Sequence, residues 1–406
     1  MTQHPYLLTA TACLLALLST VGAALPYPIL PPLFAADAAN SLNHFLGLPP
    51  KLLFGIALTI NPIGLLIGSA VIGPLSDRYG RRQILLGTAL GAAAGHALTA
   101  FALVLQSYPL FVLARFVTGL LEGNGSVARA LLADQLDGSL RSRAFAWLNG
   151  AFYLGWLAGP LLAGLTLGFG ITVPFWCAVV ALVLLAGLVA WVLPAAESAG
   201  KSGPSWWDVA RQQHALNLLQ HSSLRTLFIA QLAYFCGVTG FYEFYPLWLV
   251  EVGGFDARAI AWATAMMCAV MTLTSALLAG RESRTAPLRR AAWMAFLVTA
   301  AVLAVAGGNL LIGLCAIAAF GVPHALFNGV VPAWSSERFG MHGQGAVMGL
   351  LSFCFCLANI LMALAGSVLT LLDTRLILAA GAVLTAWSGW RFLRWDAELQ
   401  AERVPV

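Results

Sequence analysis

One densely charged segment between two long apolar stretches constrains the fold more than any other feature. Residues 73–82 read Gly-Pro-Leu-Ser-Asp-Arg-Tyr-Gly-Arg-Arg. The flanking residues 52–72 and 84–105 are predominantly apolar. Charge this dense requires water, whereas the flanks require lipid or a protein interior. The pattern therefore predicts a polar loop between two membrane-spanning helices.

The composition leads to the same class of protein. Apolar residues make up 60% of the chain and charged residues only 9%, whereas soluble domains carry about 25% charged residues. The seven cysteines all lie in apolar segments, and none has the spacing of a metal ligand in a polar setting. We expect an all-α membrane protein with packing cysteines, no metal site and no cofactor.

Apolar stretches of membrane-spanning length predict twelve transmembrane helices. The predicted spans are 7–34, 51–72, 83–105, 109–133, 144–168, 171–193, 224–250, 257–279, 291–306, 309–331, 346–371 and 375–392. The first span is too long for a signal peptide and lacks a basic n-region, so we expect it to remain uncleaved.

The distribution of positive charge predicts the orientation. With the N-terminus inside, 17 of the 21 Lys and Arg residues fall in inner loops or at inner helix ends. Only Lys51, Arg258 and Arg375 fall outside, and Arg115 lies within a span. The positive-inside rule therefore places both termini in the cytoplasm. The net charge of +5 reflects this orientation and gives no indication of nucleic-acid binding.

The chain divides into two halves of six spans. We predict an N-terminal half at 1–193, a cytoplasmic linker at 194–223, and a C-terminal half at 224–406 with a short tail. Residues 143–150 align weakly with 345–352. Two halves related by an axis along the membrane normal would place a substrate site between them near the midplane. Within the linker, an interfacial helix after Ser205 and a disordered segment remain equal alternatives.

The charged segment resembles the signature loop of the major facilitator superfamily, and every defined position of that pattern is present. The resemblance implies a conformational lock in which Asp77 caps the next helix and Arg81 reaches Asp134. The residues implied in this gating loop are Gly73, Asp77, Arg78, Gly80, Arg81, Arg82 and Asp134. The alternative is that the charged segment serves only to set the orientation of the chain in the membrane.

The next spans resemble the drug/proton antiporters of this superfamily, in particular the tetracycline antiporters. Arg115 and Gly119 resemble the Arg-x-x-x-Gly pattern in the fourth helix of this superfamily. The fifth span carries a motif similar to Gly-Pro-x-x-Gly-Gly, formed by Gly155, Gly159, Pro160 and Gly164, with Ala163 in place of one glycine. The tetracycline antiporters carry an aspartate in the first span, but residues 18–21 contain no acid. Tetracycline is therefore a doubtful substrate.

Spacing alone places a line of charge along the fourth span. Arg115, Glu122 and Arg129 are seven residues apart, so each lies about 20° from the last on one helix face. Ser126 falls on the same face. A charge at the bilayer centre costs roughly 2.5–3.5 kcal/mol, so this face should meet a water-filled cavity or a partner helix. The residues either contact a polar, anionic or zwitterionic substrate, or Glu122 merely neutralises Arg115.

Glu243 is the other acidic residue well inside a span, and it lies in the aromatic stretch 241–246. A buried carboxylate here could carry a proton. The alternative is that Glu243 contacts water near the outer end of the span or is hydrogen-bonded to Tyr242 or Tyr245. His324, with Asn328 one turn away, is a further cavity candidate. His96 is a lone histidine that we expect a backbone or hydroxyl group to satisfy.

The sequence thus predicts a monomeric secondary transporter of the bacterial inner membrane. It would export a small organic molecule as protons move inward. A proton-coupled importer of a carboxylate nutrient or siderophore is the alternative. A membrane enzyme or receptor is remote, because no span carries a cluster of catalytic or ligand-binding residues. A phosphate-binding glycine loop is also absent, which excludes ATP-driven pumping by this chain.

Overall fold

The computed structural model describes residues 5–35, 40–136, 138–193, 215–278, 286–342 and 344–401. The regular elements of these ranges are helices. The long helices are α1 (Pro5–Ala24), α2 (Pro26–Leu33), α3 (Pro50–Tyr79), α4 (Arg81–Val104), α5 (Tyr108–Glu122), α6 (Gly125–Gln135), α7 (Gly138–Thr166), α8 (Val173–Val192), α10 (Ser222–Gly253), α11 (Ala257–Leu278), α12 (Pro287–Ala306), α13 (Leu310–Phe339), α14 (Gln344–Leu369) and α15 (Thr374–Ala401).

The helices correspond to the twelve predicted spans, and the predicted all-α membrane fold is confirmed. In the described ranges, 11 helical segments are long and apolar enough to cross a membrane. The remaining predicted span, 109–133, is divided into α5 and α6, and neither part alone has spanning length. The prediction of one continuous helix there was wrong, because the helix breaks at Gly123 and Asn124.

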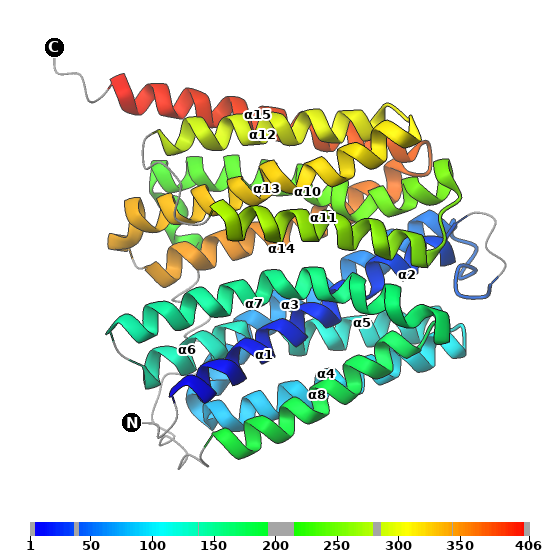
Figure 1. The fold of residues 1–406 in the computed structure, drawn as a ribbon, viewed down its shortest axis with the longest axis horizontal. Coiled ribbons are helices and arrows are strands. Elements are labelled where there is room, and N and C mark those ends of the chain that lie inside the picture. The colour runs from blue at the N-terminus through cyan, green and yellow to red at the C-terminus, as the bar shows by residue number, and fades with distance from the viewer. Residues whose placement is uncertain are drawn as a thin grey trace. The chain divides into compact units, whose positions relative to one another are not determined.

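The chain forms two compact units by internal contacts. Unit 1 contains residues 1–213 with 257–262, and unit 2 contains 214–256 with 263–406. In unit 1, α3 packs along α5, α1 along α7, and α4 along both α5 and α8 (Figure 1). In unit 2, α15 packs along α12 and α10, while α12 also packs along α13.

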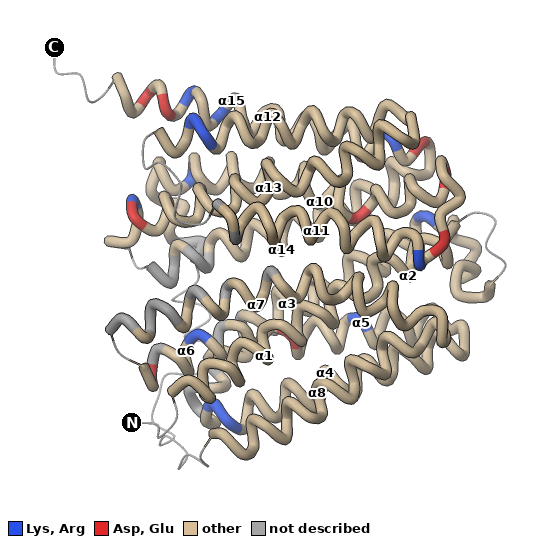
Figure 2. The backbone as a smooth tube through the Cα atoms, in the orientation of Figure 1, with Lys and Arg blue, Asp and Glu red and all other residues tan. Residues whose placement is uncertain are grey.

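Most of the charged residues described in each unit lie near helix ends, whereas Arg115 of α5 and Glu243 of α10 lie within helices. Figure 2 shows long stretches of helix without a lysine, arginine, aspartate or glutamate. Large apolar side chains are instead exposed along the helices, as Val180, Leu184 and Trp191 are on α8. An apolar exterior of this kind is stable in lipid and not in water.

The charged segment 73–82 is mostly helical, so the prediction of a ten-residue loop was wrong in extent. α3 continues to Tyr79 and α4 begins at Arg81. Only Gly80 interrupts them, with φ 94°, a value that other residues rarely adopt. The charges therefore occupy the last turn of α3 and the first turn of α4. The predicted interfacial helix after Ser205 lies outside the described residues, and 215–220 form a short 3₁₀ helix, η2.

Candidate functional site

The break in the fourth span is held by one polar side chain. Asn124, which precedes α6, accepts a hydrogen bond from Ser19 Oγ at 3.3 Å. Its Nδ2 donates to Thr88 Oγ1 at 3.4 Å. The break is thus tied to α1 and α4. In transporters, interrupted spans carry backbone groups and helix ends that bind substrates or ions.

Immediately before this break, Glu122 is paired with a histidine. Glu122 Oε1 lies 3.0 Å from Nε2 of His96, on α4. His96 is 0% exposed and Glu122 is 6% exposed. His96 was expected to bond a backbone or hydroxyl group, and that expectation was wrong. The two residues are 26 positions apart on different helices, so spacing along one helix gave no indication of the pair.

Arg115 lies two turns before Glu122 and is 4% exposed. Its Nε and Nη1 make no hydrogen bond within the described part of the chain. Glu122 and Tyr27 are close enough to interact with the guanidinium electrostatically. Asn61 Nδ2 donates to the Arg115 carbonyl oxygen at 3.2 Å and to Thr118 Oγ1 at 3.4 Å. Buried guanidinium donors without partners are well suited to receive an anionic group.

The predicted line of charge does not continue beyond the break. Arg129, on α6, is exposed, and its guanidinium carbon lies 5.3 Å from the centre of the Phe152 ring. The Ser126 side chain is outside the described residues. The structure therefore groups Arg115 and Glu122 with His96, and it separates Arg129 from them, because the seven-residue spacing assumed a straight helix.

At the end of unit 1 that carries the charged segment, Arg81 contacts Asp134 of α6. Arg81 Nε and Nη2 each lie 3.1 Å from Asp134 Oδ2. Arg81 Nη1 donates to Ser76 Oγ at 2.6 Å, and Ser76 in turn donates to the Gly73 carbonyl at 2.7 Å. Arg82 donates to the Ala190 carbonyl of α8 at 2.8 Å. The side chains of Asp77 and Arg78 are outside the described residues.

The glycines of the fifth-span motif bring α7 close to α1. A Cβ at Gly155 would lie 2.7 Å from the Leu17 carbonyl oxygen, and one at Gly159 would lie 3.0 Å from that of Val21. Any larger residue would therefore separate the helices. Pro160 lies inside α7, and Gly164 follows one turn later.

In unit 2, Glu243 of α10 is 1% exposed. Neither of its carboxylate oxygens has a hydrogen bond in the described part of unit 2. The tyrosines named as alternative partners bond other groups: Tyr242 contacts Cys268 Sγ at 3.7 Å, and Tyr245 contacts Thr264 Oγ1. A carboxyl group without a partner can gain or lose a proton without breaking a hydrogen bond.

His324 and Asn328 form a chain of hydrogen bonds on the same unit. Tyr234 Oη lies 3.0 Å from His324 Nδ1, and Asn328 Nδ2 lies 3.0 Å from His324 Nε2. If the Asn328 amide donates, Nδ1 carries the histidine proton and donates to Tyr234. The chain leads from the half-buried Asn328 to the buried Tyr234.

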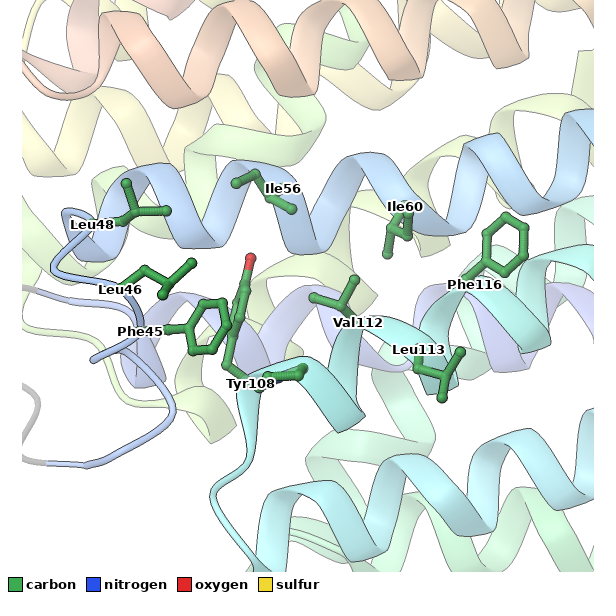
Figure 3. A pocket seen from close by; sticks show the side chains of 10 residues that line it. Phe45, Leu46, Leu48, Ile56, Ile60, Tyr108, Val112, Leu113 and Phe116 are labelled. Carbon is green, nitrogen blue, oxygen red and sulfur yellow. The ribbon is translucent and has the colours of Figure 1, made fainter.

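An open apolar groove lies between α3, α5 and the segment 45–48 (Figure 3). Its lining includes Phe45, Ile56 and Val112. The Tyr108 hydroxyl, at the same place, donates to the Leu53 carbonyl at 2.7 Å. The described residues that line this groove include no charged group.

The polar site also contains residues that the sequence analysis missed, chiefly Gly22 and Tyr27 beside Glu122 and Arg115. A repeated pattern could have indicated them. Gly22-x₄-Tyr27-Pro28 in the first span recurs as Gly240-x₄-Tyr245-Pro246 in the seventh. Glu243 lies inside the second copy of this pattern.

Two curated proteins are similar to part of this chain. It is 33% identical to the class B tetracycline resistance protein of Escherichia coli over 158 residues, which is 38% of this chain and 36% of the relative. It is 28% identical to a putative niacin/nicotinamide transporter of Bacillus subtilis (strain 168) over 203 residues, which is 48% of this chain and 47% of the relative. These alignments span less than half the length of either relative.

The fold is shared over nearly the whole chain. A crystal structure of a human organic anion transporter superposes with a TM-score of 0.70 over 96% of this chain and 99% of that one, at 19% identity. The model of the family described as the Major Facilitator Superfamily matches residues 12–363. These findings identify a membrane transporter rather than an enzyme. The chain therefore belongs to the Major Facilitator Superfamily.

Proposed function

We propose that this protein exports a small polar organic molecule from a bacterial cell in exchange for protons. Both termini would lie in the cytoplasm, and the protein would act as a monomer in the inner membrane. The observation that carries the proposal is the buried group formed by Arg115, Glu122 and His96. It combines a cation with free donors and a carboxylate that can take a proton, within a predicted membrane span.

The chemistry of this group favours a zwitterionic substrate for export. An anionic group would bind the free donors of Arg115, and a cationic or donor group would bind Glu122. Protonation of Glu122 would then neutralise the carboxylate that binds the positive group of the substrate. Proton and substrate would compete, as exchange requires. The similarity to tetracycline resistance proteins supports export, because expulsion of a drug confers resistance.

Glu243 is the second carboxylate proposed to carry the proton. It is buried and has no hydrogen bond to the described residues. His324 and Asn328 would contribute polar groups to the substrate path in unit 2. Ser126 and Arg129 would contribute to it in unit 1, with Arg129 at an exposed position.

The Arg81 and Asp134 contact is proposed to act as a gate. The pair would hold α4 against α6 in one conformation and separate in another, as alternating access requires. Gly73, Asp77, Arg78, Gly80 and Arg82 belong to the same proposed gate.

Import is a second candidate, and Arg115 is the observation that favours it. A simple anion would need only Arg115, and proton uptake by Glu122 would add one positive charge nearby. Proton and anion would then bind together, as an importer requires. The similarity to a putative niacin/nicotinamide transporter agrees with this alternative.

Transport into everted membrane vesicles tests the proposal. Vesicles with an imposed pH gradient, acidic inside, are incubated with a panel that includes tetracycline, nicotinamide and organic acids. Export predicts accumulation of at least one compound, lost when an ionophore collapses the gradient. Accumulation only with a gradient that is alkaline inside, in which proton and substrate enter together, would replace export by import. Accumulation of no compound with either gradient would contradict proton coupling for this panel.

A further inference from the structure

We infer that His96 and Glu122 bind the transported proton as a pair, and that Glu122 does not titrate alone. This inference rests on proton coupling in the proposed function, and it holds for either direction of transport. Its basis is the geometry of two helices, α4 and α5, which bring two titratable side chains together away from solvent.

The two side chains contact each other directly, and each has a second polar atom without a hydrogen bond to described residues. His96 Nε2 and Glu122 Oε1 are 3.0 Å apart. The other polar atoms, His96 Nδ1 and Glu122 Oε2, are buried and make no hydrogen bond to described residues. An imidazole can accept a proton at one nitrogen while it releases one from the other. A proton that arrives at Nδ1 can therefore leave through Nε2 to the carboxylate, and the pair gains one proton in total.

The surroundings contain few other charges. Arg115 of α5 is the cation that interacts with Glu122, and Tyr27 of α2 interacts with Arg115. Among the described residues, two uncharged groups from other helices lie against the pair: Gly22 of α1 and Phe175 of α8, whose ring centre is 6.4 Å from that of His96. Asn61 of α3 donates to the Arg115 carbonyl, and Asn124 donates to Thr88. With Glu122 ionised and His96 neutral, the charges of Arg115 and Glu122 cancel. Proton uptake gives the group one net positive charge.

Gly22 gives an independent indication that the space is reserved for the pair. A Cβ at this position would overlap both His96 Nε2 and Glu122 Oε1. Even alanine would thus force the two side chains apart. This makes Gly22→Ala a test of the contact that leaves both titratable groups in the chain.

The experiment is an infrared pH titration of the full-length purified protein, with the proton as the only probe. The carboxyl band lost in Glu122→Gln identifies Glu122. In His96→Gln, the amide nitrogen replaces Nε2 as a donor but cannot titrate. Loss of a titrating partner at this distance should move the Glu122 midpoint by about one pH unit or more. Gly22→Ala should also move it. Thr99→Val, one turn further along α4 and equally buried, should leave it unchanged.

The outcomes separate this inference from the proposed function. A Glu122 midpoint that is the same in wild type, His96→Gln and Gly22→Ala overturns the pair, even if vesicles show gradient-driven transport. A Glu122 midpoint that differs from wild type in His96→Gln and Gly22→Ala supports the pair, even if the direction of transport proves to be import. If His96→Gln fails to insert, Gly22→Ala decides the question. A wild-type protein in which Glu122 does not titrate at all overturns both the pair and coupling through Glu122.

Discussion

Arg81 contacts Asp134 through two nitrogen atoms, Nε and Nη2, each 3.1 Å from the same carboxylate oxygen. The pair joins α4 to α6, on the far side of the fourth-span break from Glu122. Asp134 is 51% exposed, and exposed ion pairs contribute only about 0–1 kcal/mol to stability. The contact should therefore contribute little to the stability of the fold.

Loss of this contact should impair transport more than stability. We predict that Arg81→Ala, Asp134→Asn and Asp77→Asn insert normally but transport about tenfold more slowly, which corresponds to roughly 1.4 kcal/mol on one step. Initial rates in vesicles, normalised to the amount of inserted protein, measure the effect. Arg394→Ala removes an exposed contact to Glu398 at the end of α15 and serves as the control. Wild-type rates in all three variants would reduce the segment to a topology anchor.

The close contact of α1 with α7 predicts a stability effect. Gly159→Val should lower the apparent Tm of the purified protein by several degrees, because overpacking at a tight contact costs roughly 1–3 kcal/mol. Gly187→Ala, on α8, is the matched control, since a Cβ there meets nothing within 4 Å. The two variants are compared by thermal unfolding in detergent. An equal Tm for Gly159→Val and wild type would contradict the packing described for the motif.

Orientation is tested with reporter fusions. A reporter placed after Val406 or within 195–204 should be active only in the cytoplasm, and one within 38–48 only outside, because the positive-inside rule favours the orientation with most lysines and arginines in the cytoplasm. Activity assays of alkaline phosphatase and fluorescent protein fusions measure this. An inverted result at any site would refute the twelve-span orientation.

The pH dependence of substrate binding distinguishes export from import. For export, binding of a transported compound to the purified protein should weaken as the pH falls, because proton and substrate compete at Glu122. For import, it should strengthen. The Kd is measured from pH 5 to pH 8 in wild type and in Glu122→Gln, in which the dependence should be reduced. A Kd independent of pH in wild type would contradict both forms of coupling at this site.

The sequence predicted the fold well because the length and apolar character of each span decide whether it crosses a membrane. It did not predict where a span breaks. Gly123 and Asn124 interrupt the fourth span, yet a glycine and an asparagine also occur inside continuous helices such as α3. At the break, Asn124 accepts a hydrogen bond from Ser19 and donates one to Thr88, and these bonds connect residues far apart in the chain.

The candidate site was predicted only in part for a similar reason. Periodicity along one helix identified Arg115 and Glu122 as neighbours on one face, and both are buried. It could not indicate how α4 is rotated against α5, which decides that His96 contacts Glu122. The partner of Glu122 thus depends on packing between helices, to which Gly22 contributes because it lacks a side chain.

Gradient-driven accumulation in carboxylate variants tests the central claim most directly. Glu122→Gln and Glu243→Gln keep the shape of the side chain but cannot titrate. Everted vesicles are loaded by a pH gradient, and exchange without a gradient is measured in parallel. Glu398→Gln, outside the apolar part of α15, is the control. We predict that at least one of the two buried variants loses gradient-driven accumulation but retains exchange. If both accumulate substrate as the wild type does, proton coupling through a buried carboxylate is contradicted.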